Sequence, residues 1–366
     1  MIQDFTPSDF WWKNITGASA MTNDAVNAIT EGYSLILGVP GHVPWPDTMR
    51  RIIRENISSG DIYITVIDAG NECGESPGDY LLRHYDTERR YRSRLASVQD
   101  YFMGNKALGG HIFWLHNFAD KAQASEWAAF CGKYPSESAD TGLFIIDTDS
   151  GNIMPSGRVK AVNYDDYAES HDTMIFASFL LDAERSSTQQ YSREWKQYIS
   201  LLAAMLCGNN AQLAESFIRA GNFTRYEPSD ILESVCGECP EDVSVRIWSA
   251  QVQVFFPMIE LARVRIIRNY KGLSDKLAFA LSWLNANGQA MKQSDGKTVI
   301  DPEDLDTGGL FHLLCQSKMI KPVDEELNEY VSLLRSFRNL LAHMTPCQVN
   351  DVSDLLEYER RYADKL

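Results

Sequence analysis

A change of pattern near residue 186 is the feature that most constrains the fold of this 366-residue chain. Before that point, apolar runs of strand length alternate with segments of helical periodicity. Such alternation is typical of βαβ units, and it predicts a mostly parallel sheet with flanking helices. After that point nearly every segment has helical periodicity, which predicts an all-α region. We therefore predict an α/β domain over residues 1–185, a helical connector over 186–244 and a helical bundle over 245–366.

The composition is that of an ordinary globular protein, and its charge excludes some partners. The net charge is -16, which argues against broad binding to DNA or RNA because an acidic surface repels phosphates. No segment reads as a signal peptide or a membrane span, and the seven cysteines are scattered. These features favour a cytoplasmic protein with reduced thiols. Basic residues cluster at 89–94 and at Arg263, Arg265 and Arg268, and we interpret each cluster as a solvated helix face.

The stretch LILGVPGHVPWPDT, residues 35–48, has the layout of a phosphate-binding loop: an apolar strand, a glycine-rich turn and a helix. With Gly41 as the first glycine of G-x-x-x-x-G-K-T, the second glycine is Pro46, the lysine is Asp47, and only Thr48 agrees. With Gly38 as the first glycine, the last three places hold Val43, Pro44 and Trp45. Neither register keeps the lysine.

These replacements remove the chemistry that holds a phosphate. Pro46 has no N–H to donate, and Asp47 places a negative charge where the phosphate charge would lie. Asp47 or Thr48 is instead predicted to cap the helix that follows at 49–56. In the strand at 110–118, His116 and Asn117 occupy the places where acidic residues would hold Mg²⁺.

The layout of residues 10–185 resembles a P-loop ATPase of the AAA-like or STAND kind that has lost both catalytic signatures. The resemblance implies a pseudo-ATPase, with Gly38, Gly41 and Thr48 as remnants of a degenerate loop. Two other interpretations stay open: a plain α/β domain that never bound nucleotide, and a working NTPase. No cofactor is predicted.

Two further motifs have both a structural and a functional interpretation. CGEC, residues 236–239, has the spacing of half a zinc site or of a redox pair, but no second pair lies nearby, so a turn between helices is favoured. DTD, residues 147–149, closes a strand and is placed either to bind a cation or to form a strand-end turn.

The segment RSFRNLLAHMTP, residues 335–346, carries polar residues on an apolar helix. At about 100° per residue, an apolar arc faces a core; it consists of Leu333, Phe337, Leu340, Leu341 and Met344. Arg335, Asn339 and His343 form a stripe on the opposite side, and Arg338 flanks it. The stripe is either a solvated face that ends in a histidine stabilised by the helix dipole, or a functional surface.

Arg338, Asn339 and His343, together with the helices around them, look like the Arg-x4-His motif of the HEPN family over residues 245–366. The resemblance implies a homodimer in which two polar stripes face one cleft. Active members are metal-independent ribonucleases. In that role His343 would be the general acid or base, Arg338 would bind the scissile phosphate and Asn339 would orient an oxygen or the histidine. Many members serve only in binding or dimerisation.

Three functions follow as hypotheses. The leading one is a regulatory or scaffold protein that dimerises through its C-terminal helices and hydrolyses no ATP, in a bacterial defence or toxin-type system. The second is a ribonuclease that acts through Arg338 and His343. The third is a nucleotide sensor that binds without hydrolysis. The expected partners are a second copy of the chain and an RNA or a protein.

Overall fold

The computed structural model describes residues 6–58, 62–87, 89–134, 141–149, 153–183, 191–293, 295–317, 319–320 and 325–363. The chain divides into two compact units. The first comprises Met1–Asp172 with Asn209–Gln212, and the second comprises Thr173–Gly208 with Leu213–Leu366. The predicted division at residues 185 and 244 stays a prediction.

The first unit is built on a five-stranded sheet in which every pair of neighbouring strands is parallel, in the order β2-β3-β4-β1-β5. The strands are β1 (Ser34–Gly38), β2 (Tyr63–Asp68), β3 (His111–His116), β4 (Leu143–Thr148) and β5 (Val159–Asn163). The inner strands are almost continuous runs of buried residues, as expected where helices cover both faces of a parallel sheet. The predicted parallel α/β domain is confirmed.

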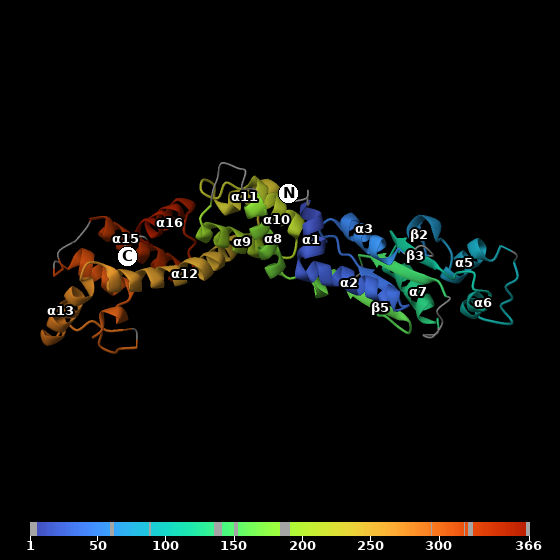
Figure 1. Ribbon diagram of the computed structural model, residues 1–366, viewed down its shortest axis with the longest axis horizontal. Helices are drawn as coiled ribbons and strands as arrows, with labels where there is room; N and C mark the ends of the chain where they lie inside the picture. Colours follow the sequence, from blue (N-terminus) through green and yellow to red (C-terminus); the bar gives the residue numbers. More distant parts are fainter. Residues whose placement is uncertain are drawn as a thin grey trace. The chain divides into compact units, whose positions relative to one another are not determined.

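Helices cover this sheet in two groups (Figure 1). The group that includes α2 packs on β1 and β5, and it consists of α1 (Pro7–Asn14), α2 (Thr16–Thr30) and α3 (Pro46–Ile57). The group around α7 consists of α4 (Ala69–Glu72), α5 (Pro77–Tyr85), α6 (Val98–Asn105) and α7 (Lys121–Gly132). Alternate residues of each strand pack against one helix group or the other. Ile36 and Ile146, for example, pack in one core with Trp127 of α7. A short 3₁₀ turn, Tyr164–Asp166, follows β5.

The second unit is helical throughout its regular structure, as predicted. Its helices are α8 (Ser170–Ala183, which begins in the first unit), α9 (Arg193–Cys207), α10 (Ala211–Ala220), α11 (Pro228–Cys236), α12 (Val243–Asn269), α13 (Leu273–Ala286), α14 (Thr307–Phe311), α15 (Glu325–Ala342) and α16 (Val349–Ala363). A 3₁₀ turn lies at Pro302–Asp304 and a π-helical turn at His312–Gln316. The segment 173–182, whose sequence fits either a strand or a helix, is part of α8.

The long helix α12 organises this unit, because it packs against α9, α13 and α15. It continues through Pro257. The three arginines that were predicted to form a solvated face are ion-paired: Arg263 with Glu260, Arg265 with Glu359 and Arg268 with Glu303. The other predicted basic helix face is wrong, because the described residues of 89–94 form irregular backbone and turns.

None of the helices in the described ranges is both long and apolar enough to span a membrane.

Candidate functional site

The carboxyl ends of β1 and β4 define the first candidate site. These strands are neighbours, but the chain leaves β1 for β2 at one edge of the sheet and leaves β4 for β5 at the other edge. The connections that leave these two neighbouring strands therefore run in opposite directions along the sheet. Open α/β sheets commonly bind ligands in the crevice outside the carboxyl ends of the strands at such a point.

An ion pair occupies this position. Arg50 of α3 reaches Asp147 of β4, donating from Nε to Oδ2 at 2.7 Å and from Nη2 to Oδ1 at 3.1 Å. Trp114 of β3 donates its indole N–H to the same Oδ2 at 2.9 Å. The Asp147 side chain is only 2% exposed, and its hydrogen bonds to Arg50 raise the pKa of the guanidinium. Asp147, which belongs to the DTD motif considered for cation binding, is thus already held by the side chains of Arg50 and Trp114.

The loop between β1 and α3 is packed against the protein. Trp12 donates its indole N–H to the carbonyl of Pro44 at 3.0 Å, and His42 lies 2.7 Å from the carboxylate of Asp165. Gly38 lies against β5, since a Cβ on it would come within 2.4 Å of Oδ1 of Asn163. Gly41 has open space beside it. The glycine at 38 is therefore explained by strand packing.

The helix after this loop begins differently from the sequence prediction. α3 begins at Pro46, and its N-cap is Trp45 in the left-handed region, with φ of 45° and no side-chain cap. The prediction that Asp47 or Thr48 caps the helix is wrong, because proline at the first helical position moves the start upstream of both. The N–H of Thr48 bonds to the carbonyl of Trp45 at 3.0 Å. The helix terminus thus presents a proline and an aspartate where an anion-binding site needs free N–H groups.

A second carboxylate also lies at the carboxyl ends of the strands. Asp68 ends β2 and accepts two hydrogen bonds from the amide of Asn117, at 2.9 and 3.1 Å. Hydrogen bonds from Asn71 and then Asn117 lower the pKa of Asp68. His116 lies opposite Asp68 in the strand register. The acid missing from the end of β3 is therefore present on the neighbouring strand, where an asparagine holds it.

In the second unit, the C-terminal end of α15 is fixed by α12. Trp248 donates its indole N–H to the carbonyl of Leu341 at 2.7 Å. Gln251, which is 1% exposed, bonds to both the N–H and the carbonyl of Cys347. The helix closes with bonds from Thr345 N–H to Leu340 and from Met344 N–H to Leu341, which is a Schellman motif. His343 is therefore held at the C-cap, immediately after Ala342, the last residue of the helix.

The apolar arc of α15 is partly as predicted. Phe337 and Leu341 are buried, and Leu333 and Leu340 are half-buried. Leu334, which the predicted arc did not include, is fully buried. Met344 is 59% exposed, so its assignment to the core is wrong. The helix has ended before it, and its backbone has a φ of 57°. The left-handed residue of the C-terminal motif turns the chain away from the helix face that periodicity assigns to it.

Three of the predicted polar residues share one surface. Arg335, Asn339 and His343 line a hollow of about 520 Å³, with Ser332, Ser336, Leu340 and Thr345. The guanidinium of Arg335 lies 4.4 Å from the ring centre of Phe311.

Arg338 lines a different hollow. That hollow has about 370 Å³ and is lined also by acidic residues, among them Asp295, Asp304 and Asp306. Within one chain, the structure brings Asn339 together with His343 in one hollow, and Arg338 does not line that hollow.

These polar side chains are unpaired within the part of the chain that the structure describes. Arg338, Asn339 and His343 form no side-chain hydrogen bond or ion pair there, and Arg335 forms no ion pair. In contrast, the arginines of α12 are all paired with acidic residues. α15 therefore presents hydrogen-bonding groups that remain available to another molecule.

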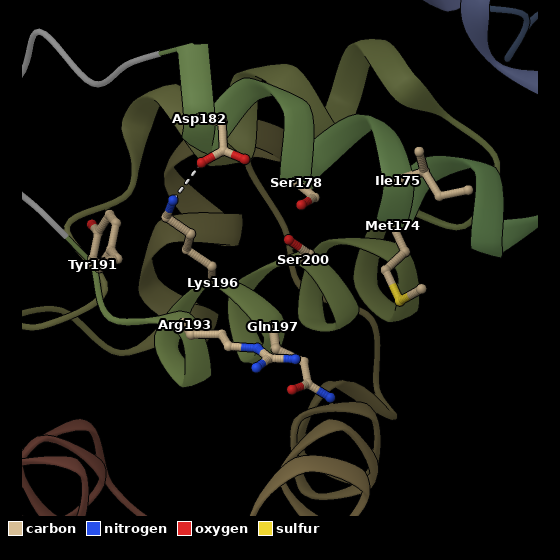
Figure 2. A pocket seen from close by; sticks show the side chains of 9 residues that line it. All are labelled: Met174, Ile175, Ser178, Asp182, Tyr191, Arg193, Lys196, Gln197 and Ser200. Carbon is tan, nitrogen blue, oxygen red and sulfur yellow. Dashed lines mark hydrogen bonds and ion pairs between the residues drawn. The ribbon is translucent and has the colours of Figure 1, made fainter. Parts of the chain in front are cut away.

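A further hollow, of about 710 Å³, lies between α8 and α9 (Figure 2). Asp182 and Lys196 form an ion pair at one end, and Ser178 and Ser200 face each other beside it. The Ser200 hydroxyl is buried and makes no hydrogen bond within the described residues. Because Asp182 neutralises Lys196, the guanidinium of Arg193 is the lining cation without an ion pair in the described structure.

The cysteines carry no metal site in the described structure. All seven are free, and no group of three or more His, Cys, Asp or Glu side chains among the described residues is placed to hold a metal ion. CGEC spans the end of α11 and the turn after it, where Gly237 is left-handed with φ of 79°.

The sequence did not reveal the partners of Asp147 and Asp68, the two carboxylates at the carboxyl ends of the strands. Arg50 lies within a segment predicted as helical, but its role depends on α3 packing on the same face as Asp147. A signal was available, because a carboxylate in a buried strand needs a cation or several donors. Asp68 carried a similar signal at the end of its strand.

No protein-family model matches the sequence, and no curated protein or solved structure matches the chain.

Proposed function

We propose that this protein is a cytoplasmic regulatory or scaffold protein that hydrolyses no nucleotide and forms a homodimer through its C-terminal helices. In this proposal the first unit is a degenerate P-loop-like domain and the second is HEPN-like. A bacterial defence or toxin-type system would suit such a combination. The free cysteines agree with a reducing compartment.

The observation that carries the proposal is a set of polar side chains on α15 that have no side-chain partner among the residues the structure describes. Asn339 and His343 lie on the surface of a helix whose other face is buried, and Trp248 of α12 is hydrogen-bonded to the end of that helix. Pre-positioned groups lose little conformational entropy on binding, so they favour an interface. A second copy of the chain offers the same groups and makes the contact symmetric.

The first unit supports the non-catalytic part of the proposal. Arg50 and Trp114 hold Asp147 in the crevice where α/β sheets commonly bind ligands. Pro46 begins the helix that would otherwise offer N–H groups to a phosphate, and Asp47 adds negative charge. These features disfavour nucleotide binding and hydrolysis.

Size-exclusion chromatography with multi-angle light scattering tests the proposal. The measurement covers protein concentrations of about 1–50 µM, a range that includes the dissociation constants of weak interfaces. In this range we expect the mass of two chains. Asn339→Glu should shift the mass toward one chain, because it adds a negative charge to this helix surface in both copies and like charges repel. Asn350→Glu on α16 is the matched control, as an exposed asparagine outside this surface. A single-chain mass throughout would reject the homodimer.

A ribonuclease is the second candidate function, and one observation favours it. Asn339, His343 and Arg335 line one hollow, and among the described residues no acidic side chain pairs with them. An imidazole beside a guanidinium can transfer a proton while the cation stabilises phosphate. The position of Arg338 in another hollow counts against it within one chain.

Labelled single-stranded RNA in EDTA distinguishes the two functions. The scaffold proposal predicts equal, background-level cleavage by the wild type and by His343→Ala. Cleavage that His343→Ala abolishes would establish the enzyme instead.

A further inference from the structure

The face that α15 presents to solvent has a regular composition along its length. Six residues recur at alternating spacings of four and three: Glu325, Glu329, Ser332, Ser336, Asn339 and His343. We call this set the α15 seam. Such spacing keeps residues on one side of a helix that packs along another helix. All six line one of two hollows, of about 680 and 520 Å³, that share Ser332 and Ser336.

The seam is symmetric in position about the level of Leu334, with carboxylates in its first half and an amide and an imidazole in its second. Ser332 and Ser336 flank that level, Glu329 and Asn339 lie further out, and Glu325 and His343 lie at the ends. The acidic half also adjoins Asp354 of α16, and the other half adjoins Arg335. The two halves are therefore complementary to each other when one helix is turned end for end.

We propose that two copies of this chain pair antiparallel along the α15 seam. Glu325 of each copy then lies opposite His343 of the other, Glu329 opposite Asn339, and Ser332 opposite Ser336. Every contact occurs twice, as a two-fold axis requires. The small serines at the centre let the two helices approach closely. This inference rests on the proposed homodimer and specifies its register.

The register has a consequence for chemistry. The two copies of His343 lie at opposite ends of the paired helices, roughly 27 Å apart along the axis for 18 residues at 1.5 Å each. They cannot share one cleft. The antiparallel pairing therefore disagrees with a composite ribonuclease site and agrees with a binding or scaffold role.

Disulfide trapping tests the register in full-length protein. Cys315 lines the same hollow as Ser332 and is exposed, so both variants carry Cys315→Ser. We expect a mixture of Ser332→Cys and Ser336→Cys chains to form a covalent dimer on mild oxidation. Neither variant should do so alone, because like positions would be offset by about 6 Å along the axis as well as by the distance between the helices. A covalent dimer from Ser332→Cys alone would indicate parallel pairing and overturn the proposal.

Charge exchange gives an independent measurement that does not depend on oxidation. His343→Glu should weaken dimerisation at least about fivefold, because it places like charges opposite one another twice. Glu325→Lys should weaken it less, because it only removes the acceptor that faces His343. The double variant should restore the wild-type dissociation constant. Glu241→Lys, an exposed charge change in the loop before α12, is the control and should have no effect.

The outcomes separate this inference from the proposed function. A dimer by light scattering that neither cross-links in the mixture nor responds to charge exchange would refute the register and leave the scaffold proposal intact. A monomer at all concentrations would refute both.

Discussion

The Arg50 guanidinium and the Asp147 carboxylate meet through two hydrogen bonds at the point where the strand order of the sheet reverses. The aspartate side chain is almost fully buried, and the arginine is partly exposed. A buried carboxylate persists only when it is paired and hydrogen-bonded. This pair therefore explains both how Asp147 is tolerated in β4 and why the crevice is unsuited to an anionic ligand.

Removal of Arg50 should destabilise the first unit. Arg50→Met leaves the Asp147 carboxylate with only the indole donor, and we expect a loss of about 3 kcal/mol in the free energy of unfolding. Urea unfolding followed by tryptophan fluorescence measures it. Arg51→Met, which removes exposed ion pairs with Asp9 and Glu55, should cost less than about 1 kcal/mol. Equal losses would show that the buried pair has no special importance.

ATP with Mg²⁺ should not stabilise the protein. A ligand at 100 times its Kd stabilises the folded state by about 2.7 kcal/mol, which raises the melting temperature by several degrees. We expect no change at millimolar MgATP in differential scanning fluorimetry, because Pro46 and Asp47 disfavour phosphate at the α3 terminus. A clear rise in melting temperature would instead support the nucleotide-sensor hypothesis.

Met344→Gly should stabilise the second unit. Met344 occupies the left-handed position of the Schellman motif, where glycine avoids a steric cost of about 1 kcal/mol. Since Met344 is exposed, little apolar packing is lost. Thermal or urea unfolding should show a gain of that size. Ala342→Gly, in the last turn of α15, should instead cost about 1 kcal/mol; a loss in both variants would contradict the assigned cap.

Acid should weaken the α1–α3 contact through Asp9. Hydrogen bonds from Lys13 and Arg51 lower the pKa of Asp9 to about 2. A carboxyl group with a lowered folded-state pKa stabilises the fold above its unfolded pKa, near 3.9, and that stabilisation is lost as the pH falls toward 2. Asp9→Asn should therefore be less stable than the wild type at pH 6, and the difference should shrink as the pH falls through the folded-state pKa of about 2. Unfolding curves between those values measure it; a difference independent of pH would contradict the assignment.

Thiol reactivity should follow burial. Cys73, Cys131, Cys207 and Cys347 are buried, and burial raises the pKa of Cys73 to about 11 and of Cys347 to about 12. Thiolates are the reactive form, so these four should resist alkylation at pH 8 until the protein unfolds. Mass spectrometry after brief iodoacetamide treatment should show labelling at Cys236 and Cys315, which are exposed. Early labelling of Cys131 would indicate that the core around α7 opens.

The sequence alone determined the secondary-structure class of each unit, because hydrophobic periodicity is a local property. Continuous apolar runs predicted the parallel strands, and helical spacing predicted α15 with its buried and polar sides. The same pattern could not place Met344, since a left-handed cap ends the helix before it. It could not pair Arg50 with Asp147 either, because those residues meet only when α3 packs on the sheet. Tertiary structure also separated Arg338 from His343: one helix carries both, but the elements packed around it place them in different hollows.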